Sequence, residues 1–223
     1  ELKAAIAVKL LVDNGIECDP SQVSVNCGAK HSCYNAILAC CNPEDEVIIP
    51  SPYWTSYPEM VRLVGAEPYI VETKKENGWK ITPEEFADAI SGRTRMLILN
   101  SPGNPTGAVY SRGEIEALVE IAVSEDILIL SDEIYEKLIY NGKKHVSTAS
   151  VSEAARDITI TINGFSKAYA MTGWRLGYTM APPEIARTIA TIQSHTTSNP
   201  TSFAQYGGLA ALQGPQSLIT DMV

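Results

Sequence analysis

The sequence predicts an α/β fold of three layers, in which helices cover both faces of a mostly parallel central sheet. Helical and strand patterns alternate along the whole chain of 223 residues, as they do around parallel sheets. Short aliphatic runs such as Ile127–Leu130 fit buried strands, while capping-box motifs such as Ser111-x-x-Glu114 mark the starts of helices. Neither a repeat nor a flexible linker interrupts the alternation, so we expect residues 1–223 to form a single domain.

In the first half of the chain, apolar periodicity predicts helices over 1–14, 29–40 and 55–64 and strands over 22–26, 47–49 and 68–72. We expect the first helix to stop at Asn14-Gly15, because glycine readily takes the left-handed conformation that closes a helix. Pro50 is expected to end the second strand, since proline has no N–H to donate to a sheet. A capping box at Thr82–Glu85 begins another helix.

In the second half, the same periodicity predicts strands over 95–99, 127–130, 157–162 and 176–181 and helices over 111–124, 183–193 and 202–213. Asn141-Gly142 is expected to form a tight turn. Glu1 lies inside a helical pattern without a capping residue, and Ser217–Val223 shows no closing element. These ends indicate that the sequence is a piece of a longer protein.

Composition and charge argue against several functional classes. The 17 Lys and Arg residues face 26 Asp and Glu residues, which gives a formal net charge of −9, whereas general nucleic-acid or anionic-membrane binders are basic. No apolar run approaches the ~18 residues of a membrane span, and no signal-peptide pattern is present. His31, His145 and His195 lack metal-ligand spacing, so we expect no metal site. The cysteines lack Cys-x-x-Cys spacing and indicate free thiols in the cytoplasm: Cys18, Cys27, Cys33, Cys40 and Cys41.

Polar residues gather just past the carboxyl ends of several predicted strands. These positions are occupied by Gly28-Ala29-Lys30, Asn104, Asp132 and Ser166-Lys167. In open α/β sheets the carboxyl ends of the strands line the ligand crevice. We therefore expect these residues, scattered along the sequence, to converge on one site.

Ordered motifs along the chain carry a resemblance to a known family. The stretch Asn163–Arg175 (NGFSKAYAMTGWR) resembles the lysine site of the class I and II aminotransferases of pyridoxal-phosphate fold type I. Ser101–Gly107 (SPGNPTG) is similar to that family's Asn-Pro-Thr-Gly loop, and Ser131–Tyr135 (SDEIY) to its Asp-x-x-Tyr segment. Ser51–Trp54 completes the set. Over essentially its whole length the chain is most similar to the bacterial aspartate aminotransferases.

The resemblance implies a pyridoxal 5'-phosphate cofactor and a role for each matching residue. Lys167 would carry the cofactor as a Schiff base and then move a proton at the substrate α-carbon. Asp132 would pair with the ring nitrogen and deepen the electron sink. Tyr135 and Asn104 would donate hydrogen bonds to the ring oxygen, and Asn104 would also lie near the substrate carboxylate. Trp54 would stack on the ring and contact the substrate.

The phosphate of the cofactor needs an anion site. Gly28, Ala29 and Lys30 begin a predicted helix, whose free N–H groups can face an anion. By the resemblance, Ser166 and Arg175 complete this site, and a guanidinium suits the paired geometry of a phosphate. Many relatives carry a second serine where this chain has Gly164. The resemblance also implies that Lys30 binds the distal carboxylate of a dicarboxylic substrate.

The expected function is the transfer of an amino group between an amino acid of the aspartate and glutamate class and a 2-oxo acid. Another reaction of the same cofactor, such as carbon–sulfur β-elimination, and a non-catalytic cofactor-domain module remain alternatives, because function depends on substrate contacts rather than on fold. Residues 1–223 would be the large cofactor-binding domain of a parent homodimer. Without the N-terminal segment and the small C-terminal domain of that parent, we expect no useful turnover from them.

Overall fold

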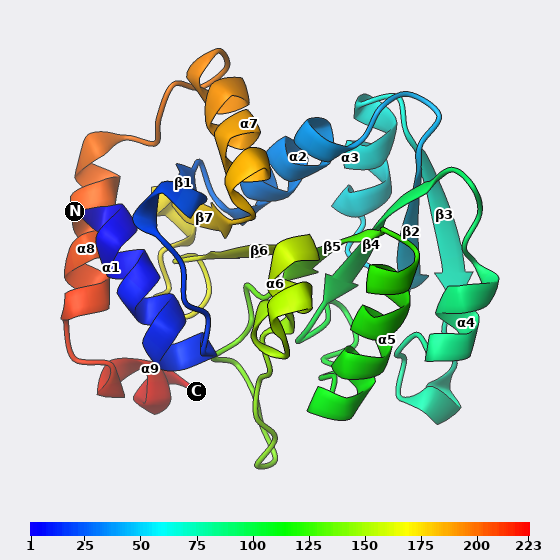
Figure 1. Cartoon of the computed structure of the whole chain (residues 1–223). Coiled ribbons are helices and arrows are strands. Elements are labelled where there is room, and N and C mark those ends of the chain that lie inside the picture. The colour runs from blue at the N-terminus through cyan, green and yellow to red at the C-terminus, as the bar shows by residue number, and fades with distance from the viewer.

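The computed structural model describes residues 1–223 and has a seven-stranded sheet at its centre, in the order β1-β7-β6-β5-β4-β2-β3 (Figure 1). The five strands β3, β2, β4, β5 and β6 are parallel to one another, whereas β7 is antiparallel to both β6 and β1. β1 therefore runs in the same direction as β6. The strands are β1 (Val23–Asn26), β2 (Glu46–Ser51), β3 (Glu67–Glu72), β4 (Thr94–Asn100), β5 (Leu128–Asp132), β6 (Thr159–Gly164) and β7 (Gly177–Met180).

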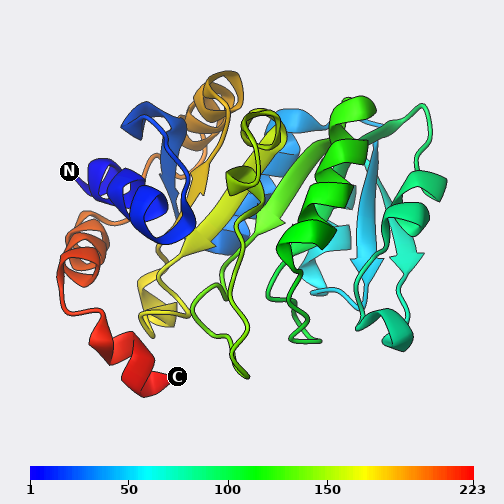
Figure 2. The same cartoon turned by 60° about the horizontal axis from the view of Figure 1, so that its bottom comes forward.

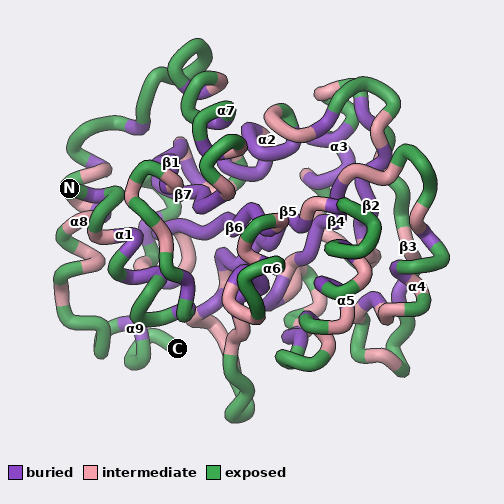
Figure 3. Tube along the Cα trace, in the orientation of Figure 1, coloured by how far each residue is buried: buried purple, intermediate pink, exposed green.

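Helices cover both faces of this sheet, which confirms the predicted three layers (Figures 1 and 2). One face packs on α2 (Ala29–Cys40), α3 (Ser56–Leu63) and α7 (Pro183–Ser194), and the other on α4 (Pro83–Asp88), α5 (Arg112–Ser124) and α6 (Glu153–Ile158). Successive residues of β4 alternate between the two cores: Met96 points to the first and Leu97 to the second. The buried part of the chain in Figure 3 follows the strands other than the edge strand β3, together with the inner sides of these helices.

A third core lies at the β1 end of the sheet. There α1 (Leu2–Lys9) packs with its buried Leu2 and Ile6 against β1 and β7, and α8 (Ser202–Gln213) lies beside α1. α9 (Ser217–Met222) follows α8. None of the helices has both the length and the apolar composition that crossing a bilayer requires.

The predicted elements are present, with a few differences that have local causes. Ser217–Met222 forms the helix α9, so the expectation of no closing element was wrong. α6 was missed because its only start signal is Ser152, whose side chain accepts from the Ala155 N–H, and its last residue, Ile158, falls in the range predicted as a strand. Pro50 lies inside β2 rather than after it, because β4 pairs with β2 only as far as Ile48.

The helix stops and starts follow the predicted chemistry. The first helix continues through a π-helical turn, Leu10–Asn14, and ends at Gly15, whose φ is 68°. Both capping boxes form: the side chain of Thr82 accepts from the Glu85 N–H, and that of Ser111 accepts from the Glu114 N–H. Each box satisfies two N–H groups that a helix start would otherwise leave free.

The N-terminus of α2 lies very close to the start of β7. A Cβ at Gly177 would be 2.5 Å from the Ala29 nitrogen and 2.6 Å from the carbonyl carbon of Gly28. Because β7 is antiparallel, its first residues lie at the same edge as the carboxyl ends of β4, β5 and β6. Glycine at 177 thus lets the start of α2 reach the edge where the parallel strands end.

We expect Gly177→Ala to destabilise the protein by about 1–3 kcal/mol, because the added methyl meets backbone atoms that cannot rotate away. Urea unfolding of the variant beside the wild type measures this. Gly113→Ala in α5 is the control, since a Cβ there meets nothing within 4 Å and alanine favours the helix by about 0.5–1 kcal/mol. Wild-type stability in Gly177→Ala would contradict the close packing of α2 on β7.

Candidate active site

A cavity of about 230 Å³ opens at the edge where the parallel strands end. Every site residue predicted from the sequence lines it except Gly28, which contacts Arg175 at its rim. Four residues outside that prediction also line it: Tyr57, Asn100, Ile134 and Thr172. The predicted residues that line it are Ala29, Lys30, Trp54, Asn104, Asp132, Tyr135, Ser166, Lys167 and Arg175.

Asp132, the last residue of β5, lies at the floor of this cavity and is buried. Its Oδ2 accepts a hydrogen bond from the Tyr57 hydroxyl at 2.7 Å and has the Cys33 thiol at 3.8 Å, while its Oδ1 accepts from the Ile134 N–H at 3.1 Å. Burial raises the pKa of Asp132, and these donors act in the opposite direction. A carboxylate in this position would pair strongly with a cationic ring nitrogen, because little water competes for it.

Lys167 and Tyr135 reach the cavity from neighbouring strand ends. Lys167 follows β6, and its Nζ lies 5.2 Å from the centroid of the Tyr135 ring. The Tyr135 hydroxyl is 3.5 Å from Nδ2 of Asn104. An amine, a phenol and an amide from three separate loops therefore face the same space.

Asn100 at the end of β4 ties two of these loops together. Its Nδ2 donates to the Asp132 carbonyl at 2.9 Å, and its Oδ1 accepts from the Asn104 N–H at 2.7 Å. The loop that carries Asn104 is thereby fixed to the strand that carries Asp132.

The start of α2 and Arg175 provide the positive end of the site. Gly28 caps α2 with φ 89° and ψ 161°, and no side chain satisfies the first N–H groups of this helix. A Cβ at Gly28 would be 2.4 Å from Nη2 of Arg175, so the guanidinium lies directly over the glycine. Nη1 of Arg175 donates to the Thr172 carbonyl at 2.7 Å, which orients the side chain. Free N–H groups beside a guanidinium form a site for an anion such as a phosphate.

Lys30 and Trp54 face each other across the mouth of the cavity. The Lys30 Nζ lies 4.9 Å from the centroid of the Trp54 ring, within the range of a cation–π interaction. Trp54 in turn contacts Tyr57 edge to face, with ring centroids 5.3 Å apart and an interplanar angle of 89°.

Packing explains why glycine occupies position 164. Gly164 pairs with Gly177 across β6 and β7, and a Cβ on it would be 2.9 Å from the Gly177 Cα and 3.0 Å from the Leu176 carbonyl oxygen. A serine side chain does not fit there unless β7 moves. Ser166 lines the cavity and remains the serine available to a phosphate.

The sequence did not point to Tyr57, Cys33 or Asn100 as site residues. Tyr57 lies three positions after Trp54, and Cys33 lies four positions after Ala29, so each lies about one helical turn beyond a predicted residue. That spacing was the available signal. Nothing in the sequence indicated which of the neighbouring side chains would turn toward Asp132.

These residues fit pyridoxal 5'-phosphate. The helix start, Arg175 and Ser166 suit the phosphate, while the buried carboxylate of Asp132 suits the ring nitrogen at the other end. The Lys167 amine and the Tyr135 phenol line the space between these two ends.

Removing the Tyr57 hydroxyl should make stability more dependent on pH. Because burial raises the pKa of Asp132 above 3.8, the folded state loses stability as the pH rises through that pKa. In Tyr57→Phe the ionised form loses a donor, so the folded pKa rises further and this loss grows. We expect the deficit in unfolding free energy relative to wild type to increase from about pH 4 to about pH 8, reaching ~1.5–3 kcal/mol.

Urea titrations of the cofactor-free protein at both pH values measure this deficit. Tyr110→Phe is the control, because the buried Tyr110 hydroxyl accepts from the Ile81 N–H and bonds no carboxylate. A Tyr57→Phe deficit that is the same at both pH values would show that the hydroxyl does not act on the charge of Asp132.

Comparison with known proteins identifies the family. The family model for aminotransferase class I and II matches residues 1–223. The chain is 50% identical over 222 residues to an aspartate aminotransferase of Bacillus subtilis (strain 168), which covers 100% of this chain and 56% of that relative. It is 49% identical over 220 residues to an aspartate/prephenate aminotransferase of Cereibacter sphaeroides, covering 98% of this chain and 55% of that protein.

A solved structure shows the same fold. The crystal structure of the aspartate aminotransferase from Rhizobium meliloti superposes with a TM-score of 0.97 at 40% identity, covering 99% of this chain and 55% of that chain. The chain thus spans about half the length of the curated relatives that it matches. With the family model matching from the first residue to the last and half of the residues identical to one relative, the chain belongs to the class I and II aminotransferases.

Proposed function

We propose that the protein transfers an amino group between an amino acid and a 2-oxo acid with pyridoxal 5'-phosphate. The observation that carries this proposal is the joining, in one cavity, of the Lys167 amine, the buried Asp132 carboxylate and an anion site at the start of α2. When bound, this cofactor supplies an aldehyde that binds amines covalently and an aromatic ring that accepts electrons. Family membership supports the choice of cofactor, since these aminotransferases depend on it.

Lys167 has two tasks in this proposal. Its Nζ holds the cofactor covalently until a substrate amine displaces it, and it then accepts and returns the proton of the substrate α-carbon. The position of Lys167 on a short loop directly after β6 supports both tasks, because the loop fixes the backbone while the side chain can swing. A positioned acid–base group of this kind contributes ~10²–10⁴-fold to a rate.

The other residues orient the ring and hold charge. Asp132 keeps a proton on the ring nitrogen, and Tyr135 with Asn104 donates to the ring oxygen. The helix start at Gly28 and Ala29, together with Arg175, binds the phosphate. Ser166 contributes a hydroxyl to that anion site. The contacts among these side chains in the cavity support these roles.

We infer that the preferred amino acid carries a second carboxylate, as aspartate does. Lys30 places a cation at the mouth of the cavity, over the face of Trp54, where a substrate side chain would enter. The names of the relatives, aspartate aminotransferase and aspartate/prephenate aminotransferase, support the same class of substrate. Trp54 and Asn104 complete the substrate contacts in this proposal.

We propose further that residues 1–223 are the large cofactor-binding domain of a longer, homodimeric protein. The share of the relatives that the chain covers, 56% for the Bacillus subtilis enzyme, supports the first part. The exposed apolar side chains on α1 and α8, among them Val8, Phe203 and Tyr206, support a surface there that another protein chain covers. The five free cysteines are compatible with the reducing cytoplasm.

Borohydride reduction tests the assignment of Lys167. In the full-length protein loaded with pyridoxal phosphate, reduction should fix the cofactor to the peptide that contains Lys167, as mass mapping would reveal. Lys167→Ala should lose this label and at least ~10²-fold in transamination, because no amine is left to hold the cofactor or move the proton.

Lys75→Ala is the matched control, since Lys75 is exposed and does not line the cavity. A label found on Lys30 or Lys137 would refute the assignment. A wild-type protein that consumes a cysteine-derived substrate without transferring its amino group would favour β-elimination instead.

Lys30→Ala tests the substrate class. We expect kcat/KM for aspartate to fall ~10–100-fold while kcat/KM for alanine stays near the wild-type value, because only aspartate loses a charged hydrogen bond. Lys74→Ala, an exposed lysine that does not line the cavity, is the control. Equal losses for both amino acids would assign Lys30 to the cofactor or to folding rather than to specificity.

A further inference from the structure

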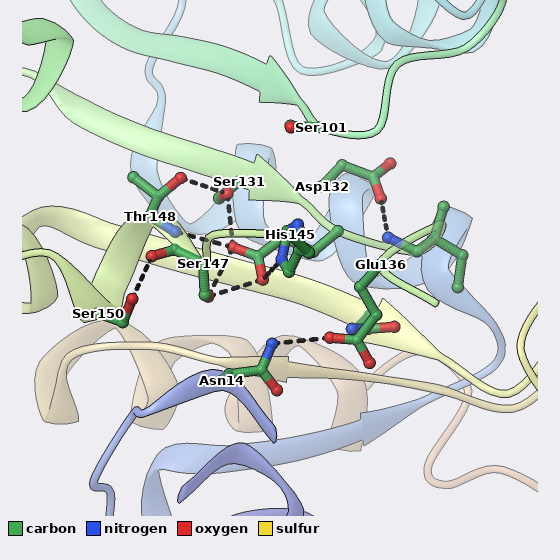
Figure 4. A network of polar contacts seen from close by, with 12 residues as sticks. Asn14, Ser101, Ser131, Asp132, Glu136, His145, Ser147, Thr148 and Ser150 are labelled. Carbon is green, nitrogen blue, oxygen red and sulfur yellow. Dashed lines mark hydrogen bonds and ion pairs between the residues drawn. The ribbon is translucent and has the colours of Figure 1, made fainter. Parts of the chain in front are cut away.

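The turn that follows β5 presents its side chains in two opposite directions. Asp132 and Tyr135 line the cavity, whereas Glu133 and Glu136 do not line it and are nonetheless buried. Figure 4 shows the polar side chains that gather on this second side of the turn. A buried carboxylate is costly unless donors surround it, so the role of these two acids depends on what holds them.

Glu133 is held by the segment that returns to the sheet after the Asn141-Gly142 turn. Its Oε1 accepts from the hydroxyls of Ser131 and Ser147, each at 2.8 Å, and from the Thr148 N–H at 3.2 Å. Its Oε2 accepts from Ser147 at 2.7 Å and contacts Nε2 of His145 at 2.8 Å. Burial by itself would lower the pKa of His145, but the charge of Glu133, its hydrogen bond to the ring and the charge of Glu136 together outweigh burial, and the pKa is raised.

Glu136 is held by the N-terminal helix. The Lys9 ammonium contacts Oε1, the Asn14 amide donates to Oε2 at 2.7 Å, and Lys9 also donates to Oδ1 of Asn14 at 2.7 Å. Burial raises the pKa of Glu136, yet the charge of Lys9 and the hydrogen bonds from Lys9 and Asn14 together more than compensate, and the net pKa is lowered. Both Lys9 and Glu136 are buried, so this ion pair is protected from water and salt.

The two carboxylates of this cluster have protein donors without a metal ion. The ligand atoms of Glu133, Glu136 and His145 lie within 4.8 Å of one another, which is a spacing that a cation could bridge. All four carboxylate oxygens already accept from protein donors, however, and the Lys9 ammonium supplies a positive charge among them. We call the two contacts that hold the turn anchors: one joins Glu133 to His145, and the other joins Glu136 to Lys9.

The turn lies outside any helix, and its backbone bonds include Glu133 N–H to the Ile162 carbonyl and Glu136 N–H to the Glu133 carbonyl, each at 2.9 Å. Lys137 adds an ion pair with Asp13 at 2.9 Å, and Asp132 also keeps its bonds with Tyr57 and the Ile134 N–H. Asp132 and Tyr135 lie one residue before Glu133 and Glu136 respectively, so the two held glutamates restrain the backbone next to both of them. A displacement of about 1 Å at a reacting group can cost ~10²-fold in rate.

We propose that the Glu133–His145 and Glu136–Lys9 anchors are positioning elements that hold Asp132 and Tyr135 against the cofactor. The inference rests on the proposed function, because it assigns these side chains to the same site. It connects the N-terminal helix, which lines no part of the cavity, to the site through Lys9 of α1 and Asn14 of the π-helical turn after it.

The test uses the full-length protein loaded with pyridoxal phosphate. Lys9→Met breaks one anchor and His145→Ala the other, with Lys3→Met on the exposed side of α1 and the exposed His195→Ala as matched controls. The principal readout is the midpoint pH of the absorption change of the bound cofactor. This midpoint depends on the donor that Tyr135 offers to the ring oxygen and does not follow overall stability.

We expect Lys9→Met and His145→Ala to raise this midpoint by about 0.5 pH unit or more, because a displaced Tyr135 no longer favours the anionic ring oxygen. Their kcat should fall ~10-fold while KM stays within about twofold. His145→Gln, which keeps a donor near Glu133, should recover most of both values. The two controls should match the wild type.

Folded, cofactor-loaded Lys9→Met and His145→Ala with wild-type midpoints would overturn the proposal. If either fails to fold, Asn14→Ala and Ser147→Ala each remove hydrogen bonds from one anchor and should shift the midpoint in the same direction by less; wild-type midpoints in both would equally overturn it. A wild-type protein that shows neither cofactor absorption nor transamination would instead refute the proposed function. Faster hydrogen exchange of the 132–138 amides in the cofactor-free Lys9→Met variant would still support the anchors in that case.

Discussion

The rest of the structure is arranged around one constraint: the carboxylate of Asp132 must be able to ionise although it lies at the end of a buried strand. Burial makes its ionised form unfavourable, and the molecule answers with three donors: the Tyr57 hydroxyl, the Ile134 N–H and the Cys33 thiol. Two of these come from α3 and α2, so both helices have to pack on the same face of the sheet in a fixed register. The core on that face and the chemistry of the cavity therefore impose the same requirement.

The topology of the sheet brings together the two ends of the site. Parallel β4, β5 and β6 deliver Asn104, Asp132 and Lys167 to one edge, as their order along the chain suggests. Antiparallel β7 delivers Arg175 to that edge from its opposite end, beside the start of α2. A sheet with a parallel strand in this place would have put the guanidinium on the far side of the molecule.

Most of the fold and many of the cavity residues could be predicted from the sequence, for different reasons. The strands were recognisable because they are short aliphatic runs between turn signals, and the cavity residues because they follow those strands or match family motifs. Tyr57 could not be assigned to Asp132, which is 75 positions away, because only the packing of α3 brings them together. The buried contacts of Lys9 with Glu136 escaped for the same reason, since a lysine in an amphipathic helix normally faces solvent. The last helix, α9, was missed because residues 217–223 carry no capping signal.

The paired glycines of β6 and β7 have a consequence for selectivity. Gly177 leaves room for the first residues of α2 against the sheet, and Gly164 lets β7 lie close to β6. This close packing determines the distance from the helix start and Arg175 to Asp132, and backbone holds both ends of that distance. A ligand can touch both ends only if the separation of its anionic group and its ring nitrogen matches this distance. The cavity thus selects ligands by the distance between these two groups. The glycines at 164 and 177 determine that distance, because they allow α2, β6 and β7 to pack this closely.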